Sequence, residues 1–435
     1  MVNKEIFKAY DIRGIYDKDF DDEFAYKLGY AFTKYLEAEE VVVCRDGRIS
    51  SPKLKEKLVE GIKDAGANAV FIGTASTPYS YYCIMKGNYK AGITITASHN
   101  PKEYNGFKLM REGSWPVSKG KGMEEVEKLI EQGECKVAEV KGEEITKNYR
   151  EEYKSFLKEN MMETHMKAVV DQSNGVGWLE AQALKDKIDV KIINSEINGN
   201  FPAHGPDPKN KDNLKQLGRA VLEEKADIGI IFDGDADRVM FVDEKGQLVR
   251  ADIIALLIIE NMAGGVIVQD PISTKQIKEE AEARGVDVIT SKVGRTNISH
   301  IVQKENADFG IETSGHYFFQ EFGGFDNPGL MVVRVLNALT DRNKKLSDVL
   351  KDVKYHHSGE LNFKVEDKDK AVSRVKEKYK DKEIDELDGI TVKTDDYWFN
   401  LRKSNTEPLI RLNAEADSEE ELTKIVEEVK EELES

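Results

Sequence analysis

The sequence has few cysteines. Its three thiols, Cys44, Cys83 and Cys135, are odd in number and widely spaced, and none belongs to a CxxC pair. A disulfide framework needs an even set of cysteines, and a structural zinc site needs closely spaced ligands. The pattern indicates neither, and we expect buried or incidental thiols.

Long apolar runs are also missing. No stretch of the 435 residues reaches the length of a transmembrane helix, and residues 1–6 contain no signal-peptide core. With 40% hydrophobic and 33% charged residues, the composition is that of a globular protein. We therefore expect no membrane association and a cytoplasmic location.

The chain has no excess of positive charge. Its 64 Lys and Arg residues stand against 81 Asp and Glu, which gives a formal net charge of −17, and no basic block offsets this charge. Nucleic acids and anionic membranes repel such a protein, so neither is an expected partner. An anionic small molecule would need local basic loops to bind.

A repeated pattern organises most of the chain. Residues 41–73 read as apolar strand, polar turn, helix and strand, and the same order returns in residues 168–193 and 266–289. Strands that alternate with helices at this spacing predict parallel sheets. The length predicts three or four domains. We place three similar α/β domains, with mixed, mainly parallel sheets, at residues 1–150, 151–252 and 253–355.

The C-terminal residues 356–435 have a different pattern. Helical periodicity covers residues 364–380 and 418–434. Helices that are separate in sequence from a small antiparallel sheet predict an α+β domain. The expected strands are residues 390–393, 398–401 and 409–412.

A polar loop follows one strand in each repeat. Residues 96–101, 233–238 and 312–316 each come after a short strand that contains a Gly-Ile pair, and residues 402–408 form a fourth loop. Open α/β sheets place ligands at the carboxyl ends of their strands. We therefore expect the chemistry of this protein to lie in these loops.

Three carboxylates alternate with small residues in the second loop. Asp233, Asp235 and Asp237 are hard oxygen ligands that suit Mg²⁺, and the adjacent Arg238 indicates a shared anion. The spacing alone leaves a solvated acidic loop as an alternative. An EF-hand is excluded, because that loop needs Gly where Arg238 stands and because residues 239–242 read as a strand.

The first loop places Ser98 next to His99. Adjacent side chains on extended backbone point apart, so the pair predicts no catalytic triad. A serine oxygen close to Mg²⁺ suits phosphoryl transfer through a phosphoserine. A plain loop hydroxyl is the alternative for Ser98.

The third and fourth loops carry groups that suit a sugar phosphate. Glu312 and Ser314 can bind sugar hydroxyls, while His316 is either a proton carrier or a buried, satisfied histidine. The fourth loop offers cationic and hydroxyl donors that suit a phosphate, although an exposed surface turn is the alternative. These donors are Arg402, Ser404, Asn405, Thr406 and Arg411.

Five motifs, in order, resemble the signatures of the α-D-phosphohexomutase family. They are FKAYDIRG at 7–14, TASHNP at 96–101, DGDADR at 233–238, ETSGH at 312–316 and RKSNTEP at 402–408. The first motif and residues 104–108 look most similar to the phosphomannomutase/phosphoglucomutase branch. Thr313, where phosphoglucosamine mutases commonly have Gln, favours the same branch, and phosphoglucosamine mutase is the alternative.

The resemblance implies four domains around a central cleft and a role for each motif. Ser98 would be the phosphoserine, and Mg²⁺ would lie between its phosphate and the three aspartates. Arg13, Lys108 and Arg238 would surround the phosphoryl group, with His99 as a further contact. Lys108 and His316 would be the candidates for general acid and base, with the division of the two roles left open, and Glu312 and Ser314 would hold the sugar. The phosphate that does not react would bind Arg402, Ser404, Asn405, Thr406 and Arg411.

The implied reaction is the reversible transfer of a phosphoryl group between the 1 and 6 positions of mannose and glucose phosphates. It would pass through a hexose 1,6-bisphosphate, which also serves as primer. Two other functions stay open from the residues alone. Asp233 and Asp235 match the Asp-x-Asp pattern of aspartate-nucleophile phosphatases, and a silent sugar-phosphate binding protein would keep the same loops. The oligomeric state is left open.

Overall fold

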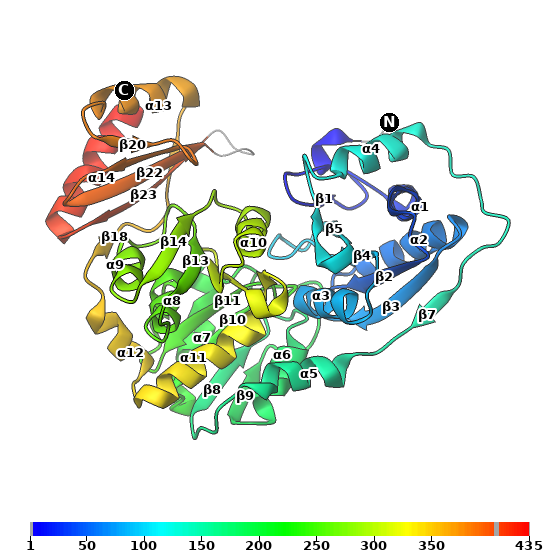
Figure 1. Cartoon of the computed structure of the whole chain (residues 1–435), viewed down its shortest axis with the longest axis horizontal. Helices are drawn as coiled ribbons and strands as arrows, with labels where there is room; N and C mark the ends of the chain where they lie inside the picture. Colours follow the sequence, from blue (N-terminus) through cyan, green and yellow to red (C-terminus); the bar gives the residue numbers. More distant parts are fainter. Residues whose placement is uncertain (1–2, 404–408, 435) are drawn as a thin grey trace. The chain divides into compact units, whose positions relative to one another are not determined.

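The computed structural model describes residues 3–403 and 409–434 (Figure 1). The chain divides into two compact units. The first comprises Met1–Val249 and Ser314–Ser347, and the second comprises Arg250–Thr313 and Asp348–Ser435. Within the described residues, no helix has both the length and the apolar character that a membrane crossing requires.

The first sheet is built around β2 (Glu40–Arg45). It pairs in parallel with β3 (Asn68–Thr74) on one side and with β4 (Ala91–Ile95) on the other. β5 (Tyr104–Arg111) runs antiparallel to β4, so the sheet is mixed. The other elements up to residue 159 are η1 (Lys4–Ile6), β1 (Ile12–Ile15), α1 (Asp22–Leu36), α2 (Ser51–Asp64), α3 (Thr77–Lys86), η2 (Glu112–Ser114), β6 (Pro116–Val117), α4 (Met123–Gln132), β7 (Glu144–Thr146) and α5 (Arg150–Glu159).

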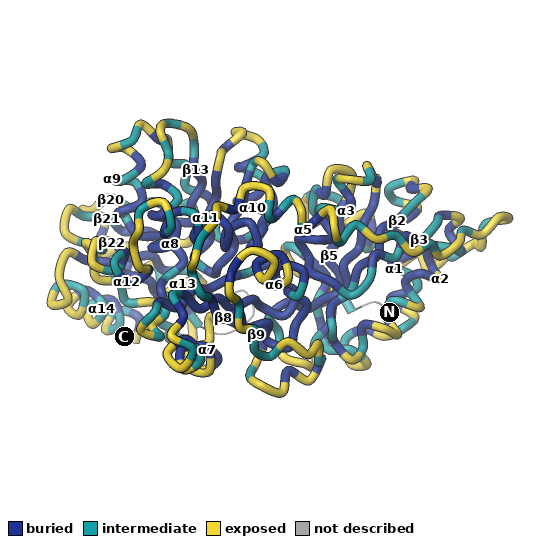
Figure 2. Tube along the Cα trace, turned by 90° about the horizontal axis from the view of Figure 1, so that it is seen from below, coloured by how far each residue is buried: buried dark blue, intermediate teal, exposed yellow. Residues whose placement is uncertain are grey.

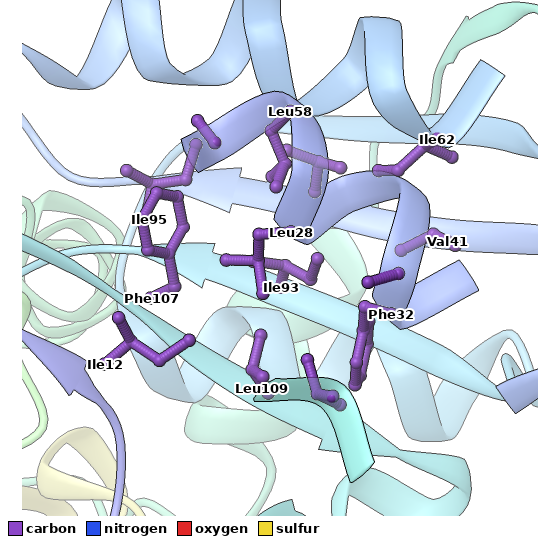
Figure 3. Close-up of a cluster of buried hydrophobic side chains, with 14 of the residues drawn as sticks. Ile12, Leu28, Phe32, Val41, Leu58, Ile62, Ile93, Ile95, Phe107 and Leu109 are labelled. Atoms are coloured by element: carbon purple, nitrogen blue, oxygen red, sulfur yellow. The ribbon is translucent and has the colours of Figure 1, made fainter. Parts of the chain in front are cut away.

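One face of this sheet packs against α1 and α2. Helix α1 begins after Asp21, whose side chain accepts a hydrogen bond of 2.9 Å from the Phe24 amide. Leu28 of α1 and Leu58 of α2 are fully buried with Ile93 of β4 in one apolar cluster (Figure 3). Truncating a leucine in such a position to alanine costs about 2–5 kcal/mol. This cluster therefore fixes β4, the strand that leads to Ser98.

Glycines allow the helices of this domain to pack closely. A Cβ at Gly29 of α1 would lie 2.2 Å from the Leu58 carbonyl oxygen, so only glycine fits where α1 crosses α2. On the opposite face of the sheet, a Cβ at Gly92 would lie 2.3 Å from Ile84 Cδ1 of α3. Helices therefore cover both faces, and β4 is buried along its whole length.

The second and third sheets repeat the order of the first. β8 (Lys167–Asp171) lies in parallel between β9 (Asp189–Ile193) and β10 (Ile228–Phe232). In the second unit, β13 (Gly265–Gln269) lies in parallel between β14 (Val286–Thr290) and β15 (Phe309–Glu312). The three predicted repeats are therefore confirmed. Figure 2 shows strands such as β5 and β8 in the colour of buried residues, whereas exposed residues lie on the helices and loops around them.

The remaining elements of residues 160–352 flank these strands. Antiparallel pairing of β10 with β11 makes the second sheet mixed. The elements are α6 (Trp178–Lys185), α7 (Lys211–Glu224), β11 (Val239–Asp243), β12 (Leu248–Val249), α8 (Ala251–Ile259), α9 (Gln276–Glu282), α10 (Arg295–Lys304), β16 (His316–Phe319), η3 (Gln320–Phe322), β17 (Phe325–Asp326), α11 (Pro328–Arg342), α12 (Leu346–Val349) and η4 (Leu350–Asp352).

The C-terminal domain is α+β, as predicted. β22 (Tyr397–Lys403) pairs antiparallel with β21 (Ile390–Lys393) and β23 (Leu409–Ala416). The other elements are β18 (His356–His357), β19 (Leu361–Lys364), α13 (Lys368–Lys378), β20 (Glu383–Asp385) and α14 (Glu419–Glu434). Its sheet buries an apolar cluster against α13 and α14.

One predicted boundary is wrong. The helix expected at 364–380 begins only at Lys368, where the Asp367 side chain caps α13 by accepting from two backbone amides. Of the expected helical residues, only Lys364 lies in a strand, the last residue of β19, which pairs with β23. The helix itself is confirmed, and its start is set by the Asp367 cap rather than by the apolar periodicity.

Candidate functional site

Ser98 lies in the loop that follows β4, in the first unit. Its backbone is left-handed, with φ of 51°, and its amide donates a hydrogen bond of 2.8 Å to Thr96 Oγ1. The expectation that Ser98 and His99 point apart is wrong, because it assumed extended backbone. The left-handed turn brings Ser98 Oγ to 3.2 Å from His99 Nδ1.

The buried Arg48 guanidinium binds the backbone of this loop. Its Nε donates to Asp46 Oδ2 at 3.0 Å, and both side chains are fully buried. A buried cation is tolerated when its charge is paired and its donors are satisfied. The remaining donors bind four carbonyl oxygens of the loop, those of Ser98 (2.7 Å), Asn100 (2.7 Å), Pro101 (2.7 Å) and Tyr104 (2.9 Å).

The loop that follows β10, residues 233–238, contacts Ser98 and is called the aspartate loop. Ser98 Oγ donates to Asp233 Oδ2 at 2.7 Å. The loop folds back on itself, because the Asp237 amide donates to Asp233 Oδ1 at 3.0 Å. Burial raises the pKa of Asp233 well above its usual value, and the charges of Asp237 and Asp235 raise it further. Three buried carboxylates so close together call for a compensating positive charge.

The three aspartates could hold a divalent cation. Asp233, Asp235 and Asp237 are buried, and each offers a carboxylate oxygen within 4.8 Å of the others. The buried Asp235 Oδ1 has no hydrogen-bond partner among the described residues, so its lone pairs are available. Hard carboxylate oxygens in such a set suit Mg²⁺.

Two residues of the N-terminal domain bind the aspartate loop. Thr77, at the start of α3, donates through its amide to the Asp235 carbonyl oxygen at 2.9 Å and through Oγ1 to Asp235 Oδ2 at 2.5 Å. Lys108 Nζ donates to Asp235 Oδ2 at 2.5 Å and to Asp237 Oδ2. Lys108 lies on β5 opposite Thr94 of β4, which places it beside the Ser98 loop. The structure thus joins the serine loop and the aspartate loop in one buried polar site.

Arg13 of β1 completes one side of the site. Its Nη1 donates to Asn100 Oδ1 at 2.6 Å, and its Nη2 donates to Asp11 Oδ2 at 2.5 Å. Its buried Nε has no hydrogen-bond partner among the described residues. Burial lowers the pKa of His99 well below its usual value, and the charges of Arg238 and Arg13 lower it further. These effects favour the neutral form of His99, whose Nδ1 contacts Ser98 Oγ.

His316 lies between an acid and a guanidinium. Arg238 Nε donates to His316 Nε2 at 3.0 Å, and His316 Nδ1 is 2.7 Å from Asp326 Oδ2. Arg238 can only donate a hydrogen bond, so His316 Nε2 must be the acceptor. The imidazole proton is therefore on Nδ1, which donates a hydrogen bond to Asp326. Asp326, on β17, thereby fixes the tautomer of His316.

The remaining predicted residues divide between the units. Ser314 is buried in the first unit, whereas Glu312, Arg402 and Arg411 belong to the second. Glu312 lies near Asp270, whose pKa burial raises to about 6, with a further contribution from the Glu312 charge. The predicted residues Ser404, Asn405 and Thr406 lie outside the described residues.

Arg402 and Arg411 lie directly opposite each other on β22 and β23. Like charges in this position destabilise a sheet unless an anion lies between them. Both Nε atoms are buried and have no hydrogen-bond partner among the described residues. The pair is therefore a suitable site for an anion with several acceptor oxygens.

Three residues that shape the site were not predicted from the sequence. Arg48, Thr77 and Asp326 bind the serine loop, Asp235 and His316, respectively. A polar role for Arg48 could have been predicted, because a charged Asp-Gly-Arg turn follows an apolar strand. Thr77 gave no local signal because its partner, Asp235, is distant in sequence. Asp326 gave none because it reaches His316 only when the chain between them forms a hairpin.

Four family models match successive parts of the chain. The alpha/beta/alpha domains I, II and III of phosphoglucomutase/phosphomannomutase match residues 4–136, 147–246 and 250–355, and the C-terminal domain of that family matches residues 360–432.

Individual proteins are similar over nearly the whole chain. A phosphomannomutase of Methanocaldococcus jannaschii is 39% identical, over 98% of this chain and 96% of the relative. A phosphomannomutase of Vibrio cholerae is 36% identical, over 97% and 98%. The crystal structure of a phosphoglucomutase/phosphomannomutase family protein from Burkholderia thailandensis has a TM-score of 0.91 at 28% identity and covers 100% of this chain and 98% of that one.

The chain therefore belongs to the phosphoglucomutase/phosphomannomutase family, and the resemblance inferred from its five motifs is confirmed. It is accordingly an enzyme, an isomerase of the phosphohexomutase class.

Proposed function

We propose that the protein interconverts the 1- and 6-phosphates of mannose and of glucose through a phosphoserine at Ser98 and a hexose 1,6-bisphosphate. The observation that carries the proposal is the 2.7 Å hydrogen bond from Ser98 Oγ to Asp233 within the aspartate cluster. A serine hydroxyl beside a candidate cation site and the basic side chains of Arg13, Lys108 and Arg238 is suited to carry a phosphoryl group.

The transfer step requires neutralised phosphoryl oxygens and an in-line acceptor. The bond from phosphorus to Ser98 Oγ breaks, and a bond forms to the free hydroxyl oxygen of the hexose monophosphate. The hydroxyl proton passes to a base, and Ser98 Oγ takes up a proton from an acid. The bisphosphate then turns and returns its other phosphoryl group to Ser98 by the same exchange.

The chain's own charges suit this step. Arg13 and Arg238 lie close enough to His99 to lower its pKa, and His99 touches Ser98. Both guanidiniums would bind the phosphoryl oxygens in this proposal. Asp233, Asp235 and Asp237 would hold Mg²⁺, which would supply charge neutralisation at the phosphoryl group.

His316 and Lys108 are the candidates for proton transfer. His316 Nε2 carries a lone pair that now accepts from Arg238. If Arg238 turns to a phosphoryl oxygen, Nε2 becomes available as a base. Lys108 is held by Asp235 and Asp237, and its ammonium protons suit the role of acid. We therefore assign His316 as base and Lys108 as acid for transfer to the sugar.

The remaining predicted residues are proposed to bind the rest of the substrate. Arg402 and Arg411 would take the phosphate that does not react, together with Ser404, Asn405 and Thr406. Glu312 would bind the sugar with Ser314. A site that reads the 3- and 4-hydroxyls accepts glucose and mannose alike, because these sugars differ only at carbon 2.

The test has two parts on one preparation. Intact-mass and peptide analysis should find one phosphoryl group on Ser98, and Ser98→Ala should lose that mass and nearly all turnover. Normal turnover in Ser98→Ala would refute the phosphoserine, and phosphate trapped on Asp233 would identify a phosphatase. The kcat/KM for mannose, glucose and glucosamine 1-phosphates should be highest for the first two, and a preference for glucosamine 1-phosphate would identify a phosphoglucosamine mutase.

A further inference from the structure

Glu360 lies against both arginines of the candidate phosphate site. Its Oε2 is 3.8 Å from Arg402 Nη2 and 3.8 Å from Arg411 Nη1. The residue directly precedes β19, which pairs with β23 and places Asn362 opposite Arg411. Glu360 is about one quarter exposed, with 23% of its side chain open to solvent. One carboxylate oxygen thus serves two guanidiniums.

These contacts are ion pairs without close hydrogen bonds. A distance of 3.8 Å exceeds hydrogen-bond length, so Glu360 accepts no hydrogen bond from either guanidinium. Asp388 Oδ2 approaches Arg402 at 3.7 Å but is already an acceptor for the Val293 amide at 2.9 Å. Pairs of this kind are weak and easily exchanged. A phosphate offers more acceptor oxygens and shorter, bidentate contacts.

We propose that Glu360 is an internal competitor of the substrate phosphate for Arg402 and Arg411. When the site holds no phosphate, its carboxylate compensates the two facing charges. When a phosphate binds, the arginines exchange the loose carboxylate contacts for hydrogen bonds to phosphate oxygens. Glu360 thereby lowers phosphate affinity and speeds phosphate release.

This role rests on the proposed function and deepens it. A mutase that passes through a bisphosphate must bind the phosphate at one end of the sugar, release it, and then bind the other end. A site that holds phosphate too tightly slows the turn between the two transfers. A carboxylate that replaces the departing phosphate stabilises the two arginines, because Asp388 contacts Arg402 alone and would leave the charge of Arg411 opposite Arg402 without a counter-charge.

Binding of glucose 6-phosphate to the full chain tests the proposal. The measurement is calorimetric titration in the Ser98→Ala background, which prevents turnover. Glu360→Gln keeps the side-chain shape and removes the charge. Loss of two weak ion pairs predicts a Kd roughly two- to thirtyfold lower than in the parent. Glu366→Gln removes one exposed charge from the same domain and is the matched control, with an expected Kd equal to that of the parent.

The direction of the change separates this role from a structural one. A damaged site would bind more weakly, so tighter binding in Glu360→Gln alone supports competition. An unchanged or higher Kd in Glu360→Gln, or an equal gain in both variants, overturns it. Inorganic phosphate should show the same order of affinities. Failure of the proposed function is seen separately, as absence of hexose phosphate interconversion by the protein with Ser98 intact.

Discussion

The guanidinium of Arg48 donates a 2.7 Å hydrogen bond to the carbonyl oxygen of Ser98, fifty positions further along the chain. With three more carbonyl oxygens of residues 100–104 bound to the same group, the backbone of the serine loop is fixed by one side chain. The orientation of Ser98 Oγ toward Asp233 therefore depends on Arg48.

Replacing Arg48 by lysine should slow turnover. Lysine keeps the charge beside Asp46 but cannot reach four carbonyl oxygens, because its donors sit on one nitrogen. A shift of the serine by about 1 Å would lower kcat roughly 100-fold. Steady-state kinetics and Ser98 phosphorylation measure the effect. The exposed Arg219→Lys on α7 is the control, and a wild-type kcat in Arg48→Lys would contradict the assignment.

Replacing Thr77 by valine should weaken metal binding. Valine has the shape of threonine but cannot donate the 2.5 Å hydrogen bond to Asp235. Loss of a residue that orients a metal ligand typically weakens affinity 10- to 100-fold. The Mg²⁺ dependence of activity and the binding of Mn²⁺ by electron paramagnetic resonance measure the change. Thr77→Ser retains the hydroxyl and should behave as wild type, and equal affinity in the valine variant would disprove the role.

Replacing Asp326 by asparagine should impair His316. The asparagine amide can donate to Nδ1, which moves the ring proton to Nε2 and removes the acceptor that now faces Arg238. We expect kcat to fall by about 100-fold or more, because a general base with the wrong tautomer has no free lone pair.

Nitrogen chemical shifts of the imidazole report the Asp326→Asn tautomer directly. Glu321→Gln, which removes an exposed carboxylate just before β17, is the control. An unchanged tautomer together with normal kcat would exclude this positioning role.

Replacing Glu180 by glutamine should remove a pH dependence of stability. Glu180 is fully buried, and burial raises its pKa from 4.5 to about 7, while Ser76 Oγ donates to it at 2.6 Å. Since the folded state holds the proton more tightly, its stabilising contribution is complete below pH 4.5. It is lost as pH rises through 7, by up to about 3 kcal/mol.

The Glu180 effect is measured by urea unfolding at pH 5 and pH 8. The wild type should lose more stability between these values than Glu180→Gln does. The exposed Glu223→Gln on α7 should keep the wild-type difference. Identical pH profiles for wild type and Glu180→Gln would show that this carboxyl is ionised at neutral pH.

The sheets were predictable because their signal is local. Runs such as Val41–Val43 and the Gly-Ile pairs at Gly92 and Gly229 recur at fixed spacing, and buried parallel strands require such apolar runs. The aspartate loop was predictable for the same reason, since its three carboxylates are close in sequence. Their positions relative to Ser98 follow from the domain contacts that Thr77 and Lys108 make with Asp235.

The rest depended on distant contacts. β19 was not predicted, because this short strand forms by pairing with β23, which is distant in sequence. The left-handed backbone of Ser98 has no signature in the residue itself, because serine is not a typical residue for positive φ. Arg48 could be recognised as charged but not as buried, since its acceptors come together only in the folded loop.

The backbone at Ser98 also limits which amino acid can serve there. Threonine offers the same hydroxyl, yet its second Cβ substituent clashes with the backbone at a φ of 51°. Ser98→Thr would oppose this conformation with about 1–2 kcal/mol of strain or turn the hydroxyl away from Asp233. The shape of the main chain, as much as the chemistry of the hydroxyl, thus selects serine for this position.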